Sequence, residues 1–520
     1  MNIKNIIKNL KVVGLLFVTI GMYYSCEDFV DEIPVSDISP EGFYRDNAEL
    51  QLALDGAYGL LSQAYSQFAI NTGEFRSDNF EPQGSNASRS SLHNSTIDPG
   101  EGYLRWANLY KTIDAVNRVI IAAENVDGVD LDILGQAHAI RAKVYFDLAR
   151  VWENIPVFTA PIATISEAYQ PQTPYATVIE TIVIPDMKKA EEFITSLDSE
   201  ITFSKAAVYA FQAEVYMWDK EELLAKEAIE NLLSLGSHSL VRTPQDWEDL
   251  FYNQIENDLA PEGRGKVQSG SELIFSFAYS DVNTSGLARA YNAGAAVSVI
   301  SRDVESKWVA RFPLDSLGWA TKYPDTDPVF TRIVEEPDTT YTEPIYGDWR
   351  HFITRNGDEY QDGSGSQDPG EARCLKWIKN RSGLNPNMDD TNIPVYRLSD
   401  MILLLAEAEL KLTNSVRSLE LINEIRTARQ LPLASEADFG TSFDEQLDFL
   451  LAERQFELFG EAKRWWDLVR NNKAIDVMTP ILLNRDEGAV TPFTQDQITW
   501  PIYIDHLNEN DLLNQNIGWR

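Results

Sequence analysis

Basic residues are scarce in this chain relative to acidic ones. Its 520 residues include 44 Lys and Arg against 80 Asp and Glu, a formal net charge of −36. Binding to nucleic acid requires clustered Lys and Arg, so the composition argues against a nucleic-acid partner. It also disfavours a polyanionic ligand, although an acidic protein can hold a local basic pocket. Such a charge keeps a surface protein soluble and unattached to anionic material.

The N-terminus lacks an apolar run long enough to span a bilayer. It begins MNIKNIIKNLK, with three lysines and no acid, and continues VVGLLFVTIGMYY. A spanning helix needs about 20 apolar residues. A positively charged start, a short apolar core and a small residue, here Ser25, are instead the three parts of a secretory signal. Residues 1–25 are therefore predicted to be a signal peptide.

Cysteine is almost absent, and Cys26 directly follows this signal. The arrangement resembles a bacterial lipoprotein signal, in which the cysteine becomes the lipidated first residue, although Tyr23 stands where leucine is usual. The alternative is an ordinary signal peptide with an incidental cysteine. A lipid anchor holds a protein at a membrane without a spanning segment. Lipidation of Cys26 leaves Cys374 as the remaining thiol, and so no disulfide within the chain and no cysteine-based metal cluster.

Motifs of the common enzyme classes are also missing. The five histidines are scattered, and no HExxH, GxSxG or P-loop pattern occurs. Glycosidases use two carboxylates at set separations, but 80 acids place pairs near each other by chance. The segment around Asp358, Asp362 and Gly363 imitates a calcium loop. Tyr360 and Pro369 occupy positions that should supply oxygen ligands, so the match fails. We expect no catalytic residues, no metal and no cofactor.

Glu453, Glu457 and Glu461 follow one another at intervals of four and invite comparison with a metal site. Di-iron bundles need Glu-x-x-His motifs, and no histidine lies on this helix. The sequence instead predicts that Arg454 and Arg464 pair with these carboxylates.

Helical periodicity dominates both ends of the chain, where apolar residues recur at intervals of three and four. Three segments, HAIRAKVYFDLARVW, KAAVYAFQAEVYMWD and RLSDMILLLAEAELKL, look like loose repeats in which small alanines sit among larger apolar residues. Tetratricopeptide hairpins have this character, because small residues let stacked helices approach closely. DEQLDFLLAERQFELFGEAKRWWDLVRNN is predicted to be one helix of about seven turns. The other expected helices cover residues 46–66, 103–125, 131–153, 177–196, 204–219 and 221–235.

The middle of the chain has a different texture. From about residue 261 to 390, Gly, Pro, Ser, Asp and aromatic residues replace the helical pattern, apart from one expected strand at 272–279. Loops of this length are usually functional or disordered. Disordered segments are poor in aromatics, so the many Trp and Tyr residues favour function.

Eight segments spread over most of the chain resemble the SusD/RagB family, surface glycan-binding lipoproteins of Bacteroidetes. Their order and number make the resemblance specific, although Tyr503 replaces a proline that is usual in the last one. They are CEDFVDEIP, YKTIDAVNRVI, RAKVYFDLARVWENIPV, ELIFSF, YRLSDMILLLAEAEL, INEIRTAR, ERQFELFGEAKRWWDLVR and ITWPIYIDHLNENDLLNQNIGW.

This resemblance implies a mostly α fold of tetratricopeptide-like hairpins with a loop-rich, irregular insert carrying short strands. The expected organisation is a signal peptide (1–25), an acidic tether (26–45), an N-terminal helical part (46–260), a loop-rich ligand-binding region (261–390) and a C-terminal helical signature region (391–520). It also implies an outer-membrane protein, lipid-anchored and facing the cell exterior. Acids just behind Cys26 resemble an export signal for the outer face; the competing explanation is a solvated tether.

The resemblance further implies a function and a partner. Family members capture an oligosaccharide or similar nutrient and sit on a SusC-like TonB-dependent transporter. The acidic charge favours a neutral glycan. The alternatives are a protein-binding repeat scaffold, a peptide-binding carrier and a lipid-anchored glycoside hydrolase.

Sugar binding needs flat aromatic faces with polar groups around the rim. Trp319 and Tyr323, beside Gly318 and Pro324, are expected in a loop and are the preferred candidates. Trp308 is expected to pack in the core, and for each candidate core packing is the competing role. The predicted ligand-binding residues are Trp319, Tyr323, Tyr291, Tyr346, Arg76, Asp78 and Phe80.

Overall fold

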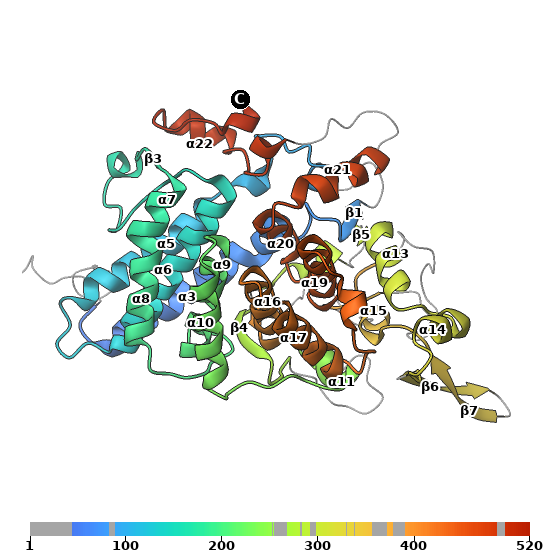
Figure 1. Ribbon diagram of the computed structural model, residues 1–520. Coiled ribbons are helices and arrows are strands. Elements are labelled where there is room, and N and C mark those ends of the chain that lie inside the picture. The colour runs from blue at the N-terminus through green and yellow to red at the C-terminus, as the bar shows by residue number, and fades with distance from the viewer. Residues whose placement is uncertain are drawn as a thin grey trace, which may run out of the picture.

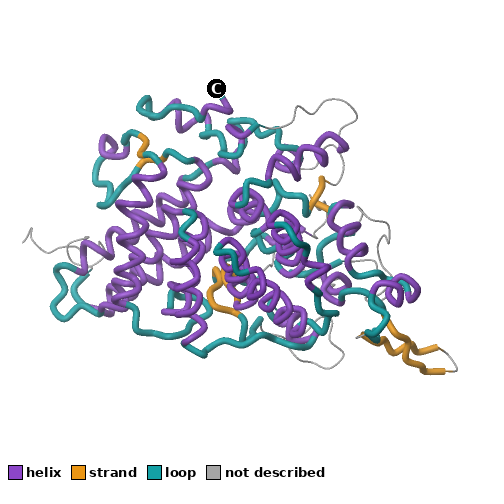
Figure 2. The backbone as a smooth tube through the Cα atoms, viewed as in Figure 1, coloured by secondary structure: helices purple, strands orange, loops and turns teal. Residues whose placement is uncertain are grey.

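The structure is a computed structural model that is mostly helical, with a few short strands, which confirms the predicted fold class (Figures 1 and 2). The signal peptide, Cys26 and the calcium-like loop lie outside the described residues, so the predictions made for them stay predictions. The described residues are 44–82, 89–251, 253, 268–280, 283–291, 298–328, 330–336, 339–355, 372–377, 390–485 and 494–520.

The N-terminal part is built of helices that pack against their neighbours in sequence. α3 packs on α5, α5 on α6, α6 on α8 and α9 on α10, as expected for stacked hairpins. Side-chain caps begin these helices: Asp46 accepts hydrogen bonds from two backbone N–H groups at the start of α3, and Ser204 caps α9. The helices are α3 (Asn47–Gly73), α4 (Ser90–His93), α5 (Ala107–Ala123), α6 (Leu131–Trp152), α7 (Tyr175–Val178), α8 (Ile184–Phe193), α9 (Lys205–Trp218), α10 (Glu222–Ser234) and α11 (Pro244–Asp249).

The second half contains the remaining helices. α16 packs on α17, on α19 and on α10, so it joins the two halves of the molecule. In the described residues, no helix has both the length and the apolar character needed to cross a bilayer. The helices are α12 (Leu287–Tyr291), α13 (Arg302–Arg311), α14 (Ser316–Lys322), α15 (Trp349–Thr354), α16 (Leu398–Lys411), α17 (Ser415–Ala428), α18 (Glu436–Phe439), α19 (Phe443–Glu457), α20 (Arg464–Arg470), α21 (Ala474–Arg485) and α22 (Ile504–Glu509).

The predicted seven-turn helix is wrong, because the chain breaks between α19 and α20. Gly460 has a φ of 76° and Ala462 a φ of 59°, so both adopt the left-handed conformation. The carboxylate of Glu74 accepts hydrogen bonds from the backbone N–H of Gly460 (3.2 Å) and of Ala462 (2.9 Å). Gly73 makes room for this turn, since a Cβ there would lie 2.0 Å from the Ala462 carbonyl oxygen. The end of α3 therefore holds the break in place.

The strands of the described residues pair two by two, all antiparallel. The predicted strand at 272–279 is confirmed as β4, and it pairs with β8 at the return to the C-terminal helices. β6 and β7 form a ribbon that projects from the body beside α14 (Figure 1). The pairs are β1 (Phe80–Pro82) with β5 (Ser298–Ile300), β2 (Ile155–Pro156) with β3 (Gln172–Thr173), β4 (Leu273–Phe277) with β8 (Ile393–Arg397), and β6 (Phe330–Glu336) with β7 (Thr339–Ile345).

The C-terminal segment returns to the N-terminal helices. The Trp152 indole at the end of α6 donates to the Pro501 carbonyl (3.0 Å), and the Asn516 amide donates to the Trp152 carbonyl (3.0 Å). The Trp500 backbone N–H donates to the Val151 carbonyl (2.8 Å). Residues about 350 positions apart in sequence thus lie in contact and join the C-terminal segment to the end of α6.

Candidate functional site

Three of the predicted residues come together around α14. The Trp319 ring lies 5.0 Å from the Tyr323 ring and 6.2 Å from the Tyr346 ring. We call Trp319, Tyr323 and Tyr346 the α14 aromatic group. Tyr323 and Tyr346 are half-buried, whereas the Trp319 side chain is 2 % exposed. Tyr323 and Tyr346 therefore carry the surface that the group offers to a ligand.

The expected loop around Trp319 is instead a short helix. The Asp315 side chain accepts a hydrogen bond from the Gly318 backbone N–H (2.8 Å) and so caps the start of α14. The Trp319 indole N–H points inward and donates to the Thr326 carbonyl (2.9 Å). The Tyr323 hydroxyl donates to the Arg311 carbonyl at the end of α13 (2.7 Å). These contacts fix the orientation of the group.

The other predicted residues are buried. The Tyr291 ring lies 5.1 Å from Phe80, and its hydroxyl donates to the Gly460 carbonyl (3.2 Å). Arg76 donates to the carbonyls of Gln497 (2.7 Å) and Ile498 (2.8 Å). In this conformation neither these side chains nor Asp78 expose surface to a ligand. Their role as ligand contacts stays a prediction that would require this part of the chain to open.

Asp78 links this buried group to α13. Its carboxylate accepts from Arg464 (2.7 Å) and from Lys307 of α13 (2.7 Å). Burial would raise the pKa of Asp78, but the two cations outweigh it and hold that pKa well below its usual range. α13 thus joins the two groups of predicted residues: Lys307 bonds Asp78, and the Arg311 carbonyl receives the Tyr323 hydroxyl.

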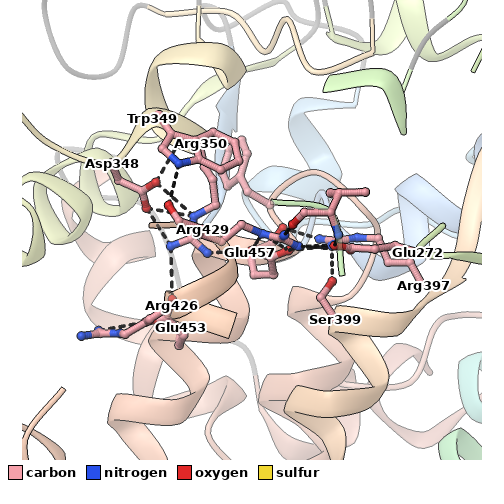
Figure 3. A network of polar contacts seen from close by, with 12 residues as sticks. Glu272, Asp348, Trp349, Arg350, Arg397, Ser399, Arg426, Arg429, Glu453 and Glu457 are labelled. Carbon is pink, nitrogen blue, oxygen red and sulfur yellow. Dashed lines mark hydrogen bonds and ion pairs between the residues drawn. The ribbon is translucent and has the colours of Figure 1, made fainter. Parts of the chain in front are cut away.

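The glutamates that resembled a metal site lie in a closed network of buried charges (Figure 3). Glu457 forms ion pairs with Arg350 (2.7 Å), Arg397 (2.6 Å) and Arg429 (2.7 Å). Glu453 pairs with Arg350 (3.1 Å) and with Arg426 (2.9 Å). Glu461 pairs with Arg397 (2.7 Å) and with Lys376, so the network contains five basic and five acidic residues: Arg350, Lys376, Arg397, Arg426, Arg429, Glu272, Asp348, Glu453, Glu457 and Glu461. Positive and negative charges therefore balance.

The predicted partners of the glutamates were wrong. Arg454 pairs with Asp400 and Asp467, both at 2.9 Å, and Arg464 pairs with Asp78. The spacing of four places Glu453 and Glu457 on one face of α19, and Glu461 lies in the break after this helix; the arginines that meet these carboxylates come from β8, α15 and the end of α17. Burial opposes ionisation of Glu457, yet the surrounding arginines hold its pKa well below its usual value.

This network anchors the start of α15, where Asp348 and Trp349 lie. The Trp308 indole donates to Asp348 (2.9 Å), and the Trp349 indole donates to the Arg429 carbonyl (2.6 Å). Trp308 is 1 % exposed and packs in the core, as expected. Within the described ranges, no three His, Cys, Asp or Glu side chains gather in a way that could hold a metal ion.

A pocket that no sequence pattern indicated lies away from α14. It has a volume of about 700 Å³ and lies between α5, the connector of residues 156–170 and α22. We call it the α5–α22 pocket. Its rings come from segments far apart in sequence, which local patterns cannot bring together. The lining includes Trp106, Tyr110, Phe158, Tyr169, His506 and Leu513.

Comparison with known proteins places the chain among SusD-like proteins. The SusD family matches residues 241–519, and a family described as "starch-binding associating with outer membrane" matches residues 28–217. SusD-like protein P38 of Formosa agariphila is 35 % identical over 98 % of this chain and 99 % of its own length. SusD-like protein P2 of the same organism is 25 % identical, with 88 % of this chain and 89 % of its own length aligned.

Solved structures agree on the fold. A SusD superfamily protein from Bacteroides vulgatus has a TM-score of 0.70 at 17 % identity, covering 92 % of this chain and all of its own. NanU of B. fragilis has a TM-score of 0.64 at 21 % identity, covering 94 % of this chain and 99 % of its own. At such identities the likeness concerns the fold alone.

Proposed function

Because the chain belongs to the SusD family, we propose that it is a cell-surface lipoprotein that binds a neutral glycan and passes it to a SusC-like TonB-dependent transporter. The observation that carries this proposal is the relationship to a SusD-like protein over nearly the whole length of both chains. The matching family described as starch-binding and outer-membrane-associated supports both the ligand class and the location. The protein acts by capture and has no catalytic role.

The start of the chain supports the proposed location. A signal peptide followed by Cys26 gives a lipid anchor, and the acidic segment of residues 26–45 tethers the body to it. A tether of this length reaches at most about 70 Å when fully extended, at about 3.5 Å per residue. The body thus stays close enough to the outer membrane to rest on a transporter. Its organisation into two helical parts and a loop-rich region remains part of the proposal.

The proposed glycan contact is the exposed side of the α14 aromatic group. Tyr323 and Tyr346 present ring surface, and Trp319 supports them from behind. The apolar face of a pyranose ring packs on such rings, while polar groups nearby bond its hydroxyls. Tyr291, Phe80, Arg76 and Asp78 are proposed as further contacts, which a ligand reaches if this buried part of the chain opens.

The test is a panel of neutral polysaccharides, with starch included, used in affinity gels against the chain that lacks residues 1–26. Tyr323→Ala and Tyr346→Ala are the informative variants, because replacing the buried Trp319 would also disturb packing. Tyr209→Ala on α9, another half-buried tyrosine, is the matched control. We expect retardation on at least one polysaccharide, reduced at least tenfold in apparent affinity by the two α14 variants and within twofold in the control.

Other outcomes select the alternatives. Retention on no polysaccharide favours a protein-binding scaffold or a peptide carrier. Release of shortened saccharides from the gel favours a lipid-anchored hydrolase. If the gel retards both α14 variants as strongly as the unaltered protein, the glycan contact lies elsewhere. Co-purification of the full chain with an outer-membrane transporter from the native membrane tests the proposed partner separately.

A further inference from the structure

The α5–α22 pocket is lined by residues of α5 and α22, two helices that lie well away from α14 (Figure 1). The proposed function, which places the glycan at α14, does not use it. Its volume of about 700 Å³ falls within the range of about 300–1,000 Å³ that small-molecule sites occupy. It is too small for a helix or a folded partner, so any occupant is a ring-sized group or a short segment.

The pocket wall is fixed in place before any ligand arrives. The connector that forms it, residues 156–170, is tied to the helices at successive points along its length. Four side chains make these bonds: Tyr110 donates to the Pro156 carbonyl (2.7 Å), Tyr145 to the Phe158 carbonyl (2.8 Å), Asp114 accepts from the Ile162 N–H (2.9 Å), and Asn510 donates to the Gln170 carbonyl (3.0 Å). A preformed wall lowers the entropy that binding would lose.

Aromatic rings line the pocket in different orientations. The Tyr110 ring is nearly perpendicular to Phe158 (88°, 5.6 Å) and to Trp106 (77°, 5.7 Å). His506 stacks on Trp106 at 4.9 Å with an angle of 6° between the rings. Burial lowers the pKa of His506 to about 4, so this ring is neutral at neutral pH. The rings thus enclose uncharged, mostly apolar space.

Polar groups surround the mouth, and their charges cancel. Lys111 and Arg118 carry two positive charges, and Asp114 and Glu509 carry two negative ones. Arg118 donates from Nε to Asp114 (2.9 Å), and a guanidinium has four further N–H donors. The chain as a whole has a net charge of −36, so a rim without net charge differs from the acidic character of the whole protein. It suits a neutral ligand with many hydroxyl groups.

Two apolar side chains stand exposed at the same mouth. Ile165 is 78 % exposed, and Tyr169 is 44 % exposed. Both belong to the tied connector and line the pocket, so Tyr169 presents its ring to whatever enters. Exposed apolar groups beside a preformed cavity mark an interaction site rather than incidental surface.

We propose that the α5–α22 pocket is a second carbohydrate subsite, which holds a pyranose unit of a neutral glycan against Tyr169. The inference rests on the proposed function, since it takes the ligand class from it and adds a separate place of contact. Stacking on Tyr169 would hold the apolar face of the sugar, and Lys111, Arg118 and Glu509 would bond its hydroxyls. A long glycan chain could then be held at two ends of the protein.

The experiment uses the chain lacking residues 1–26 and titrates maltohexaose, cellohexaose, xylohexaose and laminarihexaose by calorimetry. Tyr169→Ala removes the exposed ring, and Ala168→Trp fills the pocket from its exposed rim. Tyr341→Ala on β7 is the matched control, because Tyr341 is 45 % exposed at the other end of the molecule. Tyr323→Ala reports on the α14 site in the same series. Circular dichroism of each variant verifies the fold.

We expect at least one hexasaccharide to bind the unaltered chain. Tyr169→Ala and Ala168→Trp should each raise its Kd at least fivefold, whereas Tyr341→Ala should keep the Kd within twofold. Binding that both pocket variants leave unchanged overturns the inference while the proposed function stands. An equal loss in Tyr341→Ala also overturns it, because the effect would then not belong to the pocket. Absence of binding in the unaltered chain, on hexasaccharides and polysaccharides alike, overturns the proposed function and the subsite with it.

Discussion

The buried charge network and the α5–α22 pocket are opposites in chemistry and in what they can do. The network brings ten charged side chains together with almost no exposed surface, and each is paired with another member of the network. The pocket is built of uncharged rings that leave about 700 Å³ of space open. The charged residues, which are conspicuous in the sequence, stabilise the fold. The open site is lined by aromatic residues, some of them in the connector of residues 156–170.

The difference follows from what burial does to each kind of group. An ionised side chain taken out of water must find its counter-charge inside the protein, so a buried network becomes closed. An aromatic ring loses little when one face stays uncovered, so a ring-lined wall can remain open until a ligand arrives. The predictions below test this contrast, beginning with the largest expected effect.

Removing one acid from the network should have the largest effect. Glu457→Ala leaves Arg350, Arg397 and Arg429 with an uncompensated buried charge. We expect a loss of about 3–5 kcal/mol in the free energy of unfolding, the usual range for breaking a buried pair. Urea denaturation measures it. The control is Glu420→Ala, which breaks an exposed pair with Arg417 (3.0 Å) and should cost less than about 1 kcal/mol. Equal losses of unfolding free energy in Glu457→Ala and Glu420→Ala would mean that the buried network stabilises the fold no more than an exposed ion pair does.

Glu74 is also a buried carboxylate but, within the described residues, it forms no ion pair with an arginine, so it shows the effect of burial without such a pair. Burial raises its pKa from 4.5 to about 7, although hydrogen bonds from Asn79, Gly460 and Ala462 act against the rise. The folded state thus binds the proton more tightly than the unfolded state does. The resulting stability is fully present below pH 4.5 and is lost as the pH rises through about 7. The difference corresponds to about 3 kcal/mol at 1.36 kcal/mol per pKa unit.

Glu74→Gln cannot titrate and supplies the comparison for this prediction. Its own hydrogen-bond changes shift stability by an amount that does not depend on pH. Between pH 5 and pH 8, the unaltered protein should therefore lose about 3 kcal/mol relative to the variant in urea denaturation. Parallel stability profiles of the two proteins would show that Glu74 has an ordinary pKa.

The stability of the pocket wall should depend on individual hydrogen bonds and not on buried ion pairs. Tyr110→Phe keeps the ring and removes the bond to the Pro156 carbonyl. We expect a loss of about 1 kcal/mol in unfolding free energy, as for one neutral hydrogen bond. The same denaturation assay measures it. A loss as large as that of Glu457→Ala would mean that the wall is as tightly coupled as the network.

The smallest effect belongs to the ring at the pocket mouth. Because Tyr169 is nearly half exposed, Tyr169→Ala should change the unfolding free energy by no more than about 0.5 kcal/mol. Thermal and urea denaturation are the measurements. A larger loss would make Tyr169 a structural residue, and its effect on glycan binding would then need a different explanation.

Local sequence patterns predicted the regular helices well. The expected helices at 204–219 and 221–235 are α9 (Lys205–Trp218) and α10 (Glu222–Ser234). The break after α19 escaped prediction because the apolar spacing continues across it. The side chain that holds the break, Glu74, is 386 residues away from Gly460. Periodicity reports the face of a helix and is blind to such a partner.

The same limit applies to the candidate site. The sequence brought Trp319, Tyr323 and Tyr346 into one proposal, and the structure places their rings together. The prediction of a loop here missed that Asp315 caps a short helix, although a capping Asp is a local signal; the burial of Trp319 depends on contacts outside this segment. The α5–α22 pocket had no sequence signal: Trp106 and His506 stack on each other from opposite ends of the chain. Each looks unremarkable alone.

The return of the C-terminal segment to α6 has a consequence for how the protein is made. The Trp152 indole N–H donates to Pro501, and the Trp152 carbonyl accepts from Asn516; both partners lie near the end of the chain, so synthesis delivers them last. Contacts of such long sequence separation form slowly, because a large loop must close first. The N-terminal helices can therefore form first, and the contact with α6 closes only when the C-terminal segment arrives. A chain truncated before Trp500 would still contain every helix up to α21 and would remain open at this one seam.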